Sequence, residues 1–76
     1  MPRSKTDNNK LLSLGDRIKN LREKKGLTQE ALALACDKDK QSIQRLEAGK
    51  VNPGYLYLHQ ICEGLQIEIS ELLKSL

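Results

Sequence analysis

Four side chains with charged or hydrogen-bonding ends fall close together near the middle of the sequence: Lys40, Gln41, Gln44 and Arg45. If this segment is helical, their spacing places them on one outward side, because residues three and four apart are neighbours on a helix surface. A glutamine amide can pair with an adenine edge through two hydrogen bonds, and lysine or arginine can do so with guanine. A merely solvated helix face would have the same composition, so the surrounding elements must decide between the two interpretations.

Other residues could in principle support catalysis or metal binding. Glu47 could be a catalytic carboxylate, but no histidine or second carboxylate is placed to work with it, and a structural partner for a nearby base or helix end is expected. His59, Cys62 and Cys36 could offer three zinc ligands. Both cysteines, however, fall on apolar stripes and are expected to be small buried hydrophobic side chains. We therefore expect no enzyme activity, no metal and no cofactor.

The elements that position the four central residues are predicted to be helices. Helical spacing of apolar residues begins at Leu14. Asn9 or Ser13 could cap this first helix, and Gly26 is expected to end it. Residues 1–10 are polar and basic and are predicted to be a flexible arm, which either has no role or reaches phosphates or a DNA minor groove.

Four further helices complete an all-α domain predicted over residues 11–76. Thr28 and Asp39 are suited to cap the second and third helices, because their side-chain oxygens can accept from free backbone N–H groups. Asn52-Pro53-Gly54 opens a fourth helix, since proline is tolerated in a first turn. Apolar residues from Ile69 to Leu76 indicate a short fifth helix.

The turn at residues 37–39 joins the second and third helices in a helix-turn-helix layout. Ala33 is small enough to let the two helices cross closely, and Asp37 occupies the position that needs a positive φ. Ile43 and Leu46 are expected to face inward and to lock the third helix onto the second. The outward side of the third helix can then enter a DNA major groove, which is about 12 Å wide.

The charge distribution also favours a polyanionic partner. The formal net charge is +3, but residues 1–25 carry eight basic and three acidic side chains, whereas residues 51–76 carry one and three. No apolar stretch approaches the roughly 20 residues of a membrane span, and the N-terminus lacks the apolar core of a signal peptide. The two cysteines then indicate cytosolic thiols, so a cytoplasmic protein without a membrane partner is expected.

The stretch from Leu27 to Pro53 resembles the DNA-binding domain of phage repressors and Cro proteins, the xenobiotic-response-element family of bacterial regulators. The resemblance extends from about Leu14 to Leu72 and implies a five-helix, lambda-repressor-like fold. The residues that carry it are Leu27-Thr28-Gln29-Glu30, Leu32-Ala33, Ser42-Ile43, Arg45-Leu46-Glu47, Gly49-Lys50 and Asn52-Pro53.

Three positions in the turn region depart from the family pattern. Asp37 replaces a usual glycine, although aspartate is one of the few other residues that visit the left-handed conformation. Lys38 replaces an apolar residue and could lie over apolar surface with its amine outward. Cys36 replaces a leucine and makes the small core of the turn smaller.

The resemblance implies individual roles at the DNA surface. The residues expected at base edges are Lys40, Gln41, Gln44 and Arg45. The residues expected at phosphates are Arg22, Gln29, Ser42 and Lys50. For Arg22 the resemblance leaves two roles open, because this position either touches phosphate or supports the amino end of the second helix.

Apolar residues near the C-terminus exceed what one small core needs, so they either fill the core or form a self-association patch. The residues predicted for such a dimer interface are Tyr57, Ile69, Leu73 and Leu76. We predict a dimeric, sequence-specific duplex-DNA-binding transcriptional regulator, most simply a repressor or operon controller, without a small-molecule effector. The alternative is a protein-interaction module, such as an antitoxin whose main partner is a toxin.

Overall fold

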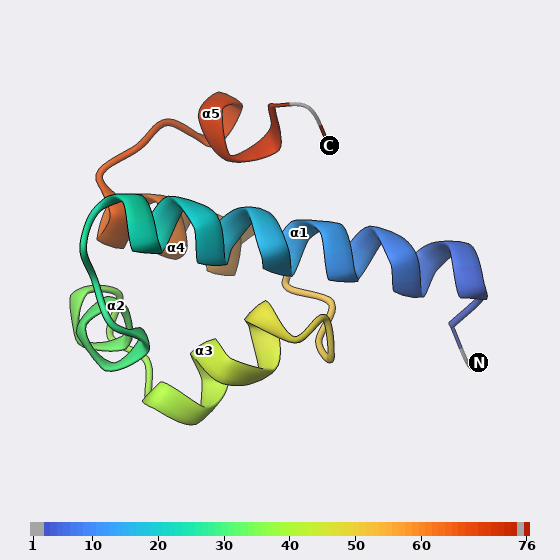
Figure 1. Ribbon diagram of the computed structural model, residues 1–76, viewed down its shortest axis with the longest axis horizontal. Coiled ribbons are helices and arrows are strands. Elements are labelled where there is room, and N and C mark those ends of the chain that lie inside the picture. Colours follow the sequence, from blue (N-terminus) through green and yellow to red (C-terminus); the bar gives the residue numbers. More distant parts are fainter. Residues whose placement is uncertain (1–2, 75) are drawn as a thin grey trace.

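The computed structural model describes residues 3–74 and residue 76 of the chain (Figure 1). In this part of the chain the secondary structure consists of five helices without a strand, which confirms the predicted all-α class. Figure 1 shows α1 crossing the molecule between α5 on one side and α2 and α3 on the other, with α4 behind. Among the described residues, no helix has the length and apolar character needed to cross a membrane. The helices are α1 (Lys5–Lys24), α2 (Gln29–Ala35), α3 (Lys40–Glu47), α4 (Tyr55–Leu65) and α5 (Ile69–Leu73).

The first helix begins earlier than predicted. Ser4 caps α1, because its Oγ accepts a hydrogen bond from the backbone N–H of Asp7 at 3.1 Å. The prediction of a flexible arm over residues 1–10 is therefore wrong from Lys5 onward, and the first two residues lie outside the described part. The described residues up to Lys10 are all exposed. They consequently lack the apolar periodicity on which the prediction depended, although their polar sequence can continue the helix.

The caps predicted for α2 and α3 are confirmed. The Oγ1 of Thr28 accepts from the backbone N–H of Ala31 at 3.0 Å. The Oδ1 of Asp39 accepts from the backbone N–H of Ser42 at 2.7 Å. This hydrogen bond lowers the pKa of the Asp39 carboxyl, because it stabilises the charged form.

The first four helices end in the same way. Each is followed by a residue with positive φ, and the N–H of the next residue returns to a carbonyl five positions earlier, which satisfies the last turn of the helix. These positive-φ residues are Gly26 (73°), Asp37 (59°), Gly49 (73°) and Gln66 (58°). The returning bonds run from Leu27 to Arg22, Lys38 to Ala33, Lys50 to Arg45 and Ile67 to Cys62, at 2.8–3.1 Å.

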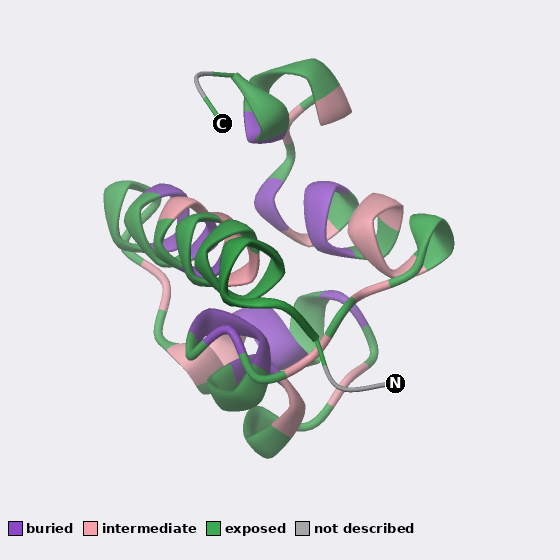
Figure 2. Cartoon of the chain, turned by 90° about the vertical axis from the view of Figure 1, so that its right-hand side faces the viewer, coloured by how far each residue is buried: buried purple, intermediate pink, exposed green. Residues whose placement is uncertain are grey.

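The core lies where α1, α2, α3 and α4 meet, and the buried segments in Figure 2 face inward toward it. The closest approach in this core joins α1 to α3 at Gly15, which is buried. A Cβ at this position would lie 2.8 Å from the carbonyl oxygen of Leu46, so only glycine allows the two helices to cross here. The buried apolar side chains are Ile18, Leu21, Leu32, Ala33, Cys36, Ile43, Leu46, Ile61, Cys62, Leu65 and Leu72.

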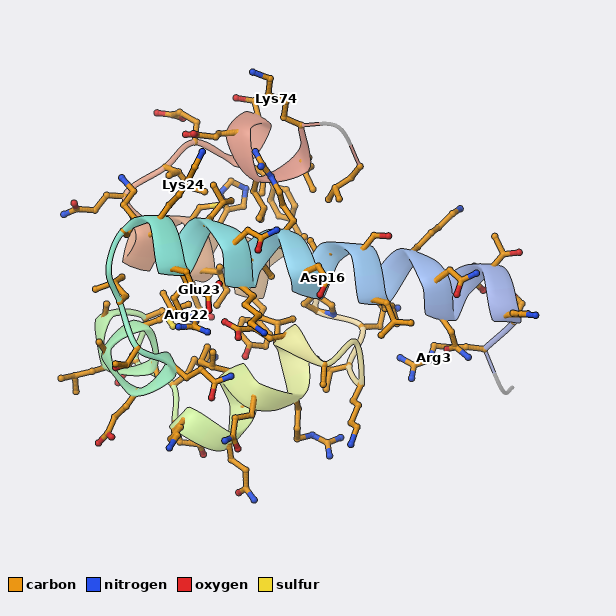
Figure 3. All side chains as sticks on the ribbon, viewed as in Figure 1. Arg3, Asp16, Arg22, Glu23, Lys24 and Lys74 are labelled. Atoms are coloured by element: carbon orange, nitrogen blue, oxygen red, sulfur yellow. The ribbon has the colours of Figure 1, made fainter. Side chains whose placement is uncertain are left out.

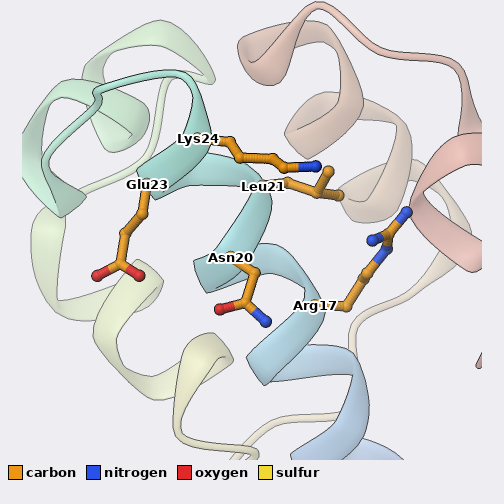
Figure 4. Close-up of a pocket in the computed structure, with 5 residues that line it drawn as sticks. All are labelled: Arg17, Asn20, Leu21, Glu23 and Lys24. Carbon is orange, nitrogen blue, oxygen red and sulfur yellow. The ribbon is translucent and has the colours of Figure 1, made fainter.

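One arginine that the sequence did not single out attaches the last helix to the first. Arg17 extends from α1 toward α5 (Figure 4). Its Nη2 donates to the carbonyl oxygen of Glu71 at 2.6 Å, and its Nε donates to that of Leu72 at 3.3 Å. Arg17 thereby satisfies carbonyl groups at the end of the short α5, which intrahelical bonds leave free.

Candidate nucleic-acid interface

The outward face of α3 carries the four side chains expected at base edges. Lys40, Gln41, Gln44 and Arg45 are all exposed. The opposite face is sealed, since Ile43 is 0% exposed and Leu46 is 1% exposed. Side chains of α3 project away from the rest of the molecule in Figure 3.

A buried ion pair holds α3 against α1. The Nε and Nη2 atoms of Arg22 donate to Oε2 and Oε1 of Glu47 at 2.7 and 3.1 Å, and both residues are buried. The remaining Nη1 donates to the carbonyl oxygen of Leu27 at 2.7 Å, just before α2. The hydrogen bond to Glu47 raises the pKa of the Arg22 guanidinium, so the cation persists. The structural role predicted for Glu47 is confirmed, and of the two roles left open for Arg22 this geometry favours the supporting one.

The same carboxylate also orients the amino end of α2. Glu47 Oε1 accepts a hydrogen bond from Nε2 of Gln29 at 3.0 Å. Gln29 is the first residue of α2 and is half-buried. Because an amide NH₂ group has two hydrogens, one N–H of Gln29 is directed by Glu47 and the other remains available to a phosphate.

A shallow surface depression connects these residues with the exposed face of α3. Gln29, Gln44 and Glu47 line it, together with Asp16 and Lys19 of α1. Sequence reasoning missed the two α1 residues. A signal was present, because Lys19 lies three residues before Arg22 and Asp16 three before Lys19, which places all three on neighbouring positions of one helix side.

The remaining two residues expected at phosphates flank α3. Ser42 is half-buried in its first turn, and its backbone N–H donates to Asp39. Lys50 is exposed directly after the positive-φ residue that ends the helix. Both ends of α3 thus present a polar or basic side chain beside its outward face.

Comparison with known proteins agrees with this geometry. The sequence profile of the helix-turn-helix family matches residues 18–72. Control protein C.MunI of a Mycoplasma species is 36% identical over 66 residues, which are 86% of this chain and 89% of that protein. The crystal structure of the restriction-modification controller protein C.AhdI from Aeromonas hydrophila superposes with a TM-score of 0.83 at 32% identity, over 86% of this chain and 98% of that one. The chain belongs to the Cro/C1-type helix-turn-helix family.

A third similar structure widens the range of relatives. The clp gene regulator ClgR from C. glutamicum has a TM-score of 0.78 at 26% identity, over 82% of this chain and 80% of that one. The family assignment makes this Cro/C1-type protein a DNA-binding transcriptional regulator. Nothing in these comparisons supports the antitoxin alternative.

The helix-turn-helix turn of this Cro/C1-type chain uses a residue that the sequence assigned elsewhere. The Nζ of Lys38 lies 4.8 Å from the ring centroid of Tyr57, so the lysine covers an aromatic face. The Tyr57 ring is half-buried, and its hydroxyl oxygen is buried without a partner among the described residues. Burial raises the pKa of Tyr57. The structure therefore places Tyr57 against the turn and not beside the C-terminal leucines, which corrects its predicted grouping with them.

The other three residues predicted for a dimer interface lie at α5. Ile69 is half-buried and packs against the core. Leu73 and Leu76 are 46% and 56% exposed, and with Leu14 of α1 they line an apolar groove. Only these last two therefore remain available to a second molecule.

Both cysteines are buried free thiols in the core, as the interpretation of small hydrophobic side chains predicted. Burial raises the pKa of both Cys36 and Cys62, because the charged thiolate would be poorly solvated there. The two thiols therefore fill space between α2 and α4 and are poorly suited to nucleophilic chemistry.

Proposed function

We propose that this regulator controls a restriction–modification operon by binding an operator as a homodimer. The carrying observation is that α3 exposes Lys40, Gln41, Gln44 and Arg45 while its opposite face is sealed in the core. The operon context is supported by similarity to C.AhdI, whose name describes a restriction-modification controller, and to C.MunI, whose name describes a control protein. Occupancy of a promoter would repress transcription without a small-molecule effector.

In this proposal α3 enters the major groove and divides its work between bases and backbone. Gln41 pairs with adenine, and Lys40 and Arg45 pair with guanine. Gln44, beside the depression that contains Gln29, reads a base at the groove wall. Gln29 and the two flanking residues Ser42 and Lys50 bind phosphates and set the register of α3.

Dimerisation in this proposal uses the apolar groove between α1 and α5. Leu73 and Leu76 leave apolar surface exposed beside Leu14, and a second copy of the chain would cover it. Two α3 helices would then sit about 34 Å apart, which is one turn of DNA. Leu73→Asp combined with Leu76→Asp should yield a monomer in sedimentation at micromolar concentration and weaken operator binding. An unchanged dimer would contradict this interface.

Selection of bound sequences from a random duplex pool tests the whole proposal. A symmetric pair of half-sites one turn apart is expected, and the operator affinity should fall steeply with salt. With about 4–6 phosphates neutralised per subunit, each contact contributes a slope near −0.9 in log affinity against log salt. A flat salt response or a pool without enrichment would refute DNA recognition by α3.

A further inference from the structure

We propose that the first turns of α1 form a second DNA-contacting element, in which Arg3 and Lys10 of α1 and its cap region bind the phosphate backbone together with Asn52. Asn52 belongs to the segment between α3 and α4. This inference rests on the proposed function, since it adds a backbone contact to the same DNA. It assigns a role to a stretch of helix that makes no contribution to the core.

Two segments far apart in the sequence create this surface. Arg3, Asp7, Lys10 and Leu11 line a shallow depression at the start of α1, and Asn52 closes it from the other segment. Leu11 is half-buried, whereas the other four side chains are exposed. The polar ends are therefore held near one another and remain accessible from solvent.

The position of this depression relative to α3 favours DNA as its partner. The 20 residues of α1 span about 30 Å, so its first turns extend well beyond the crossing with α3 at Gly15. Figure 3 shows Arg3 on the side of α1 that faces α3, whereas Lys24 and Lys74 lie on the side of α5. Lys50, already expected at a phosphate, precedes Asn52 by two residues. A basic strip therefore continues from the end of α3 to the start of α1.

The chemistry of the depression suits a phosphate. Lysine, arginine and asparagine are all common donors to phosphate oxygens. Asp7 is the one acidic residue that lines the depression. Within the described residues, neither Arg3 nor Lys10 forms an ion pair with it, so both cations remain available. The backbone N–H of Asp7 is used by the cap, which leaves its carboxylate as a negative charge that a phosphate must tolerate.

The test compares two variants that remove the same charge. Arg3→Gln with Lys10→Gln removes two positive charges at the depression, and Lys24→Gln with Lys74→Gln removes two on the opposite side. Affinities for the selected operator and for scrambled DNA are measured between 50 and 200 mM salt. Each lost contact reduces the fall in affinity over this range by about 3.5-fold. The first variant should show this loss on both DNAs equally, and the second should show much less.

A third variant predicts a change of opposite sign. Asp7→Asn removes the negative charge that faces the phosphate, so it should strengthen binding to both DNAs at low salt. The inference is overturned if the Arg3 and Lys10 variant behaves like the Lys24 and Lys74 variant, or if Asp7→Asn has no effect. Failure of the proposed function looks different, because the unaltered protein would then lack salt-dependent DNA binding altogether. Far-UV circular dichroism checks that each variant remains helical.

Discussion

Arg22 and Glu47 face each other across the α1–α3 contact in a two-point ion pair, with Nε 2.7 Å from Oε2 and side chains only 9% and 4% exposed. Because Glu47 also accepts from Gln29, this pair determines how both helices of the helix-turn-helix unit meet α1. Removal from water leaves such a pair poorly screened and makes each partner dependent on the other.

Arg22→Met should lower the free energy of unfolding by about 3–5 kcal/mol, because it leaves the Glu47 carboxylate buried without a partner. Urea unfolding followed by circular dichroism measures this loss. The matched control Arg45→Met removes an exposed arginine and should change stability by less than about 0.5 kcal/mol. Arg22→Met combined with Glu47→Leu should recover part of the loss. A double variant as unstable as the sum of the two single variants would contradict the coupling.

Asp37→Gly should raise the free energy of unfolding by about 1 kcal/mol, because a residue with a Cβ is strained at the observed φ of 59°. Gln66→Gly offers a matched comparison, since Gln66 has a φ of 58° at the end of α4 and lies outside the helix-turn-helix unit. Both variants are compared by chemical denaturation, and operator affinity should change little in either. Loss of stability on Asp37→Gly alone would mean that the aspartate side chain stabilises the turn.

The cap at the start of α3 should make stability sensitive to acid. The hydrogen bonds from Ser42 lower the pKa of Asp39 below its ordinary value of 3.8. The stabilising contribution is therefore fully present above the unfolded-state pKa and is lost as the pH falls through the lower, folded-state pKa. Asp39→Asn keeps a cap without a titrating group, so the difference in stability between the two proteins should change only below about pH 4. A difference that stays constant across this range would show that the cap does not depend on the charge of Asp39.

Gln41→Ala and Gln29→Ala should affect DNA binding in different ways. Gln41 lies on the exposed start of α3, so its loss should cost about 1–3 kcal/mol on the preferred operator and relax the choice at one base pair. Gln29 is directed toward the backbone by Glu47, so its loss should weaken binding to all sequences alike. Both variants are measured on operator and scrambled DNA at one salt concentration. Equal weakening of both DNAs by Gln41→Ala would show that α3 does not read bases at this position.

Much of the fold could be predicted from the sequence because the relevant signals act over a few residues. Thr28 and Asp39 cap helices through backbone groups three residues away, and Gly26 and Gly49 end helices by their own φ. The start of α1 was misplaced because its signal is also local but purely polar. Ser4 supplies the cap, and no buried apolar residue follows it for several turns.

The sequence by itself determined the five helices, the turn at Asp37 and the set of polar residues on one side of α3. The tertiary structure decided which arginine is a structural residue and which is exposed, because Arg22 and Arg45 have the same chemistry and differ only in what packs around them. It also decided the neighbours of Tyr57, whose ring meets Lys38 and not the leucines of α5. Such contacts join residues about 20 or more positions apart, and helical periodicity places a side chain on a face without saying which other helix that face will meet.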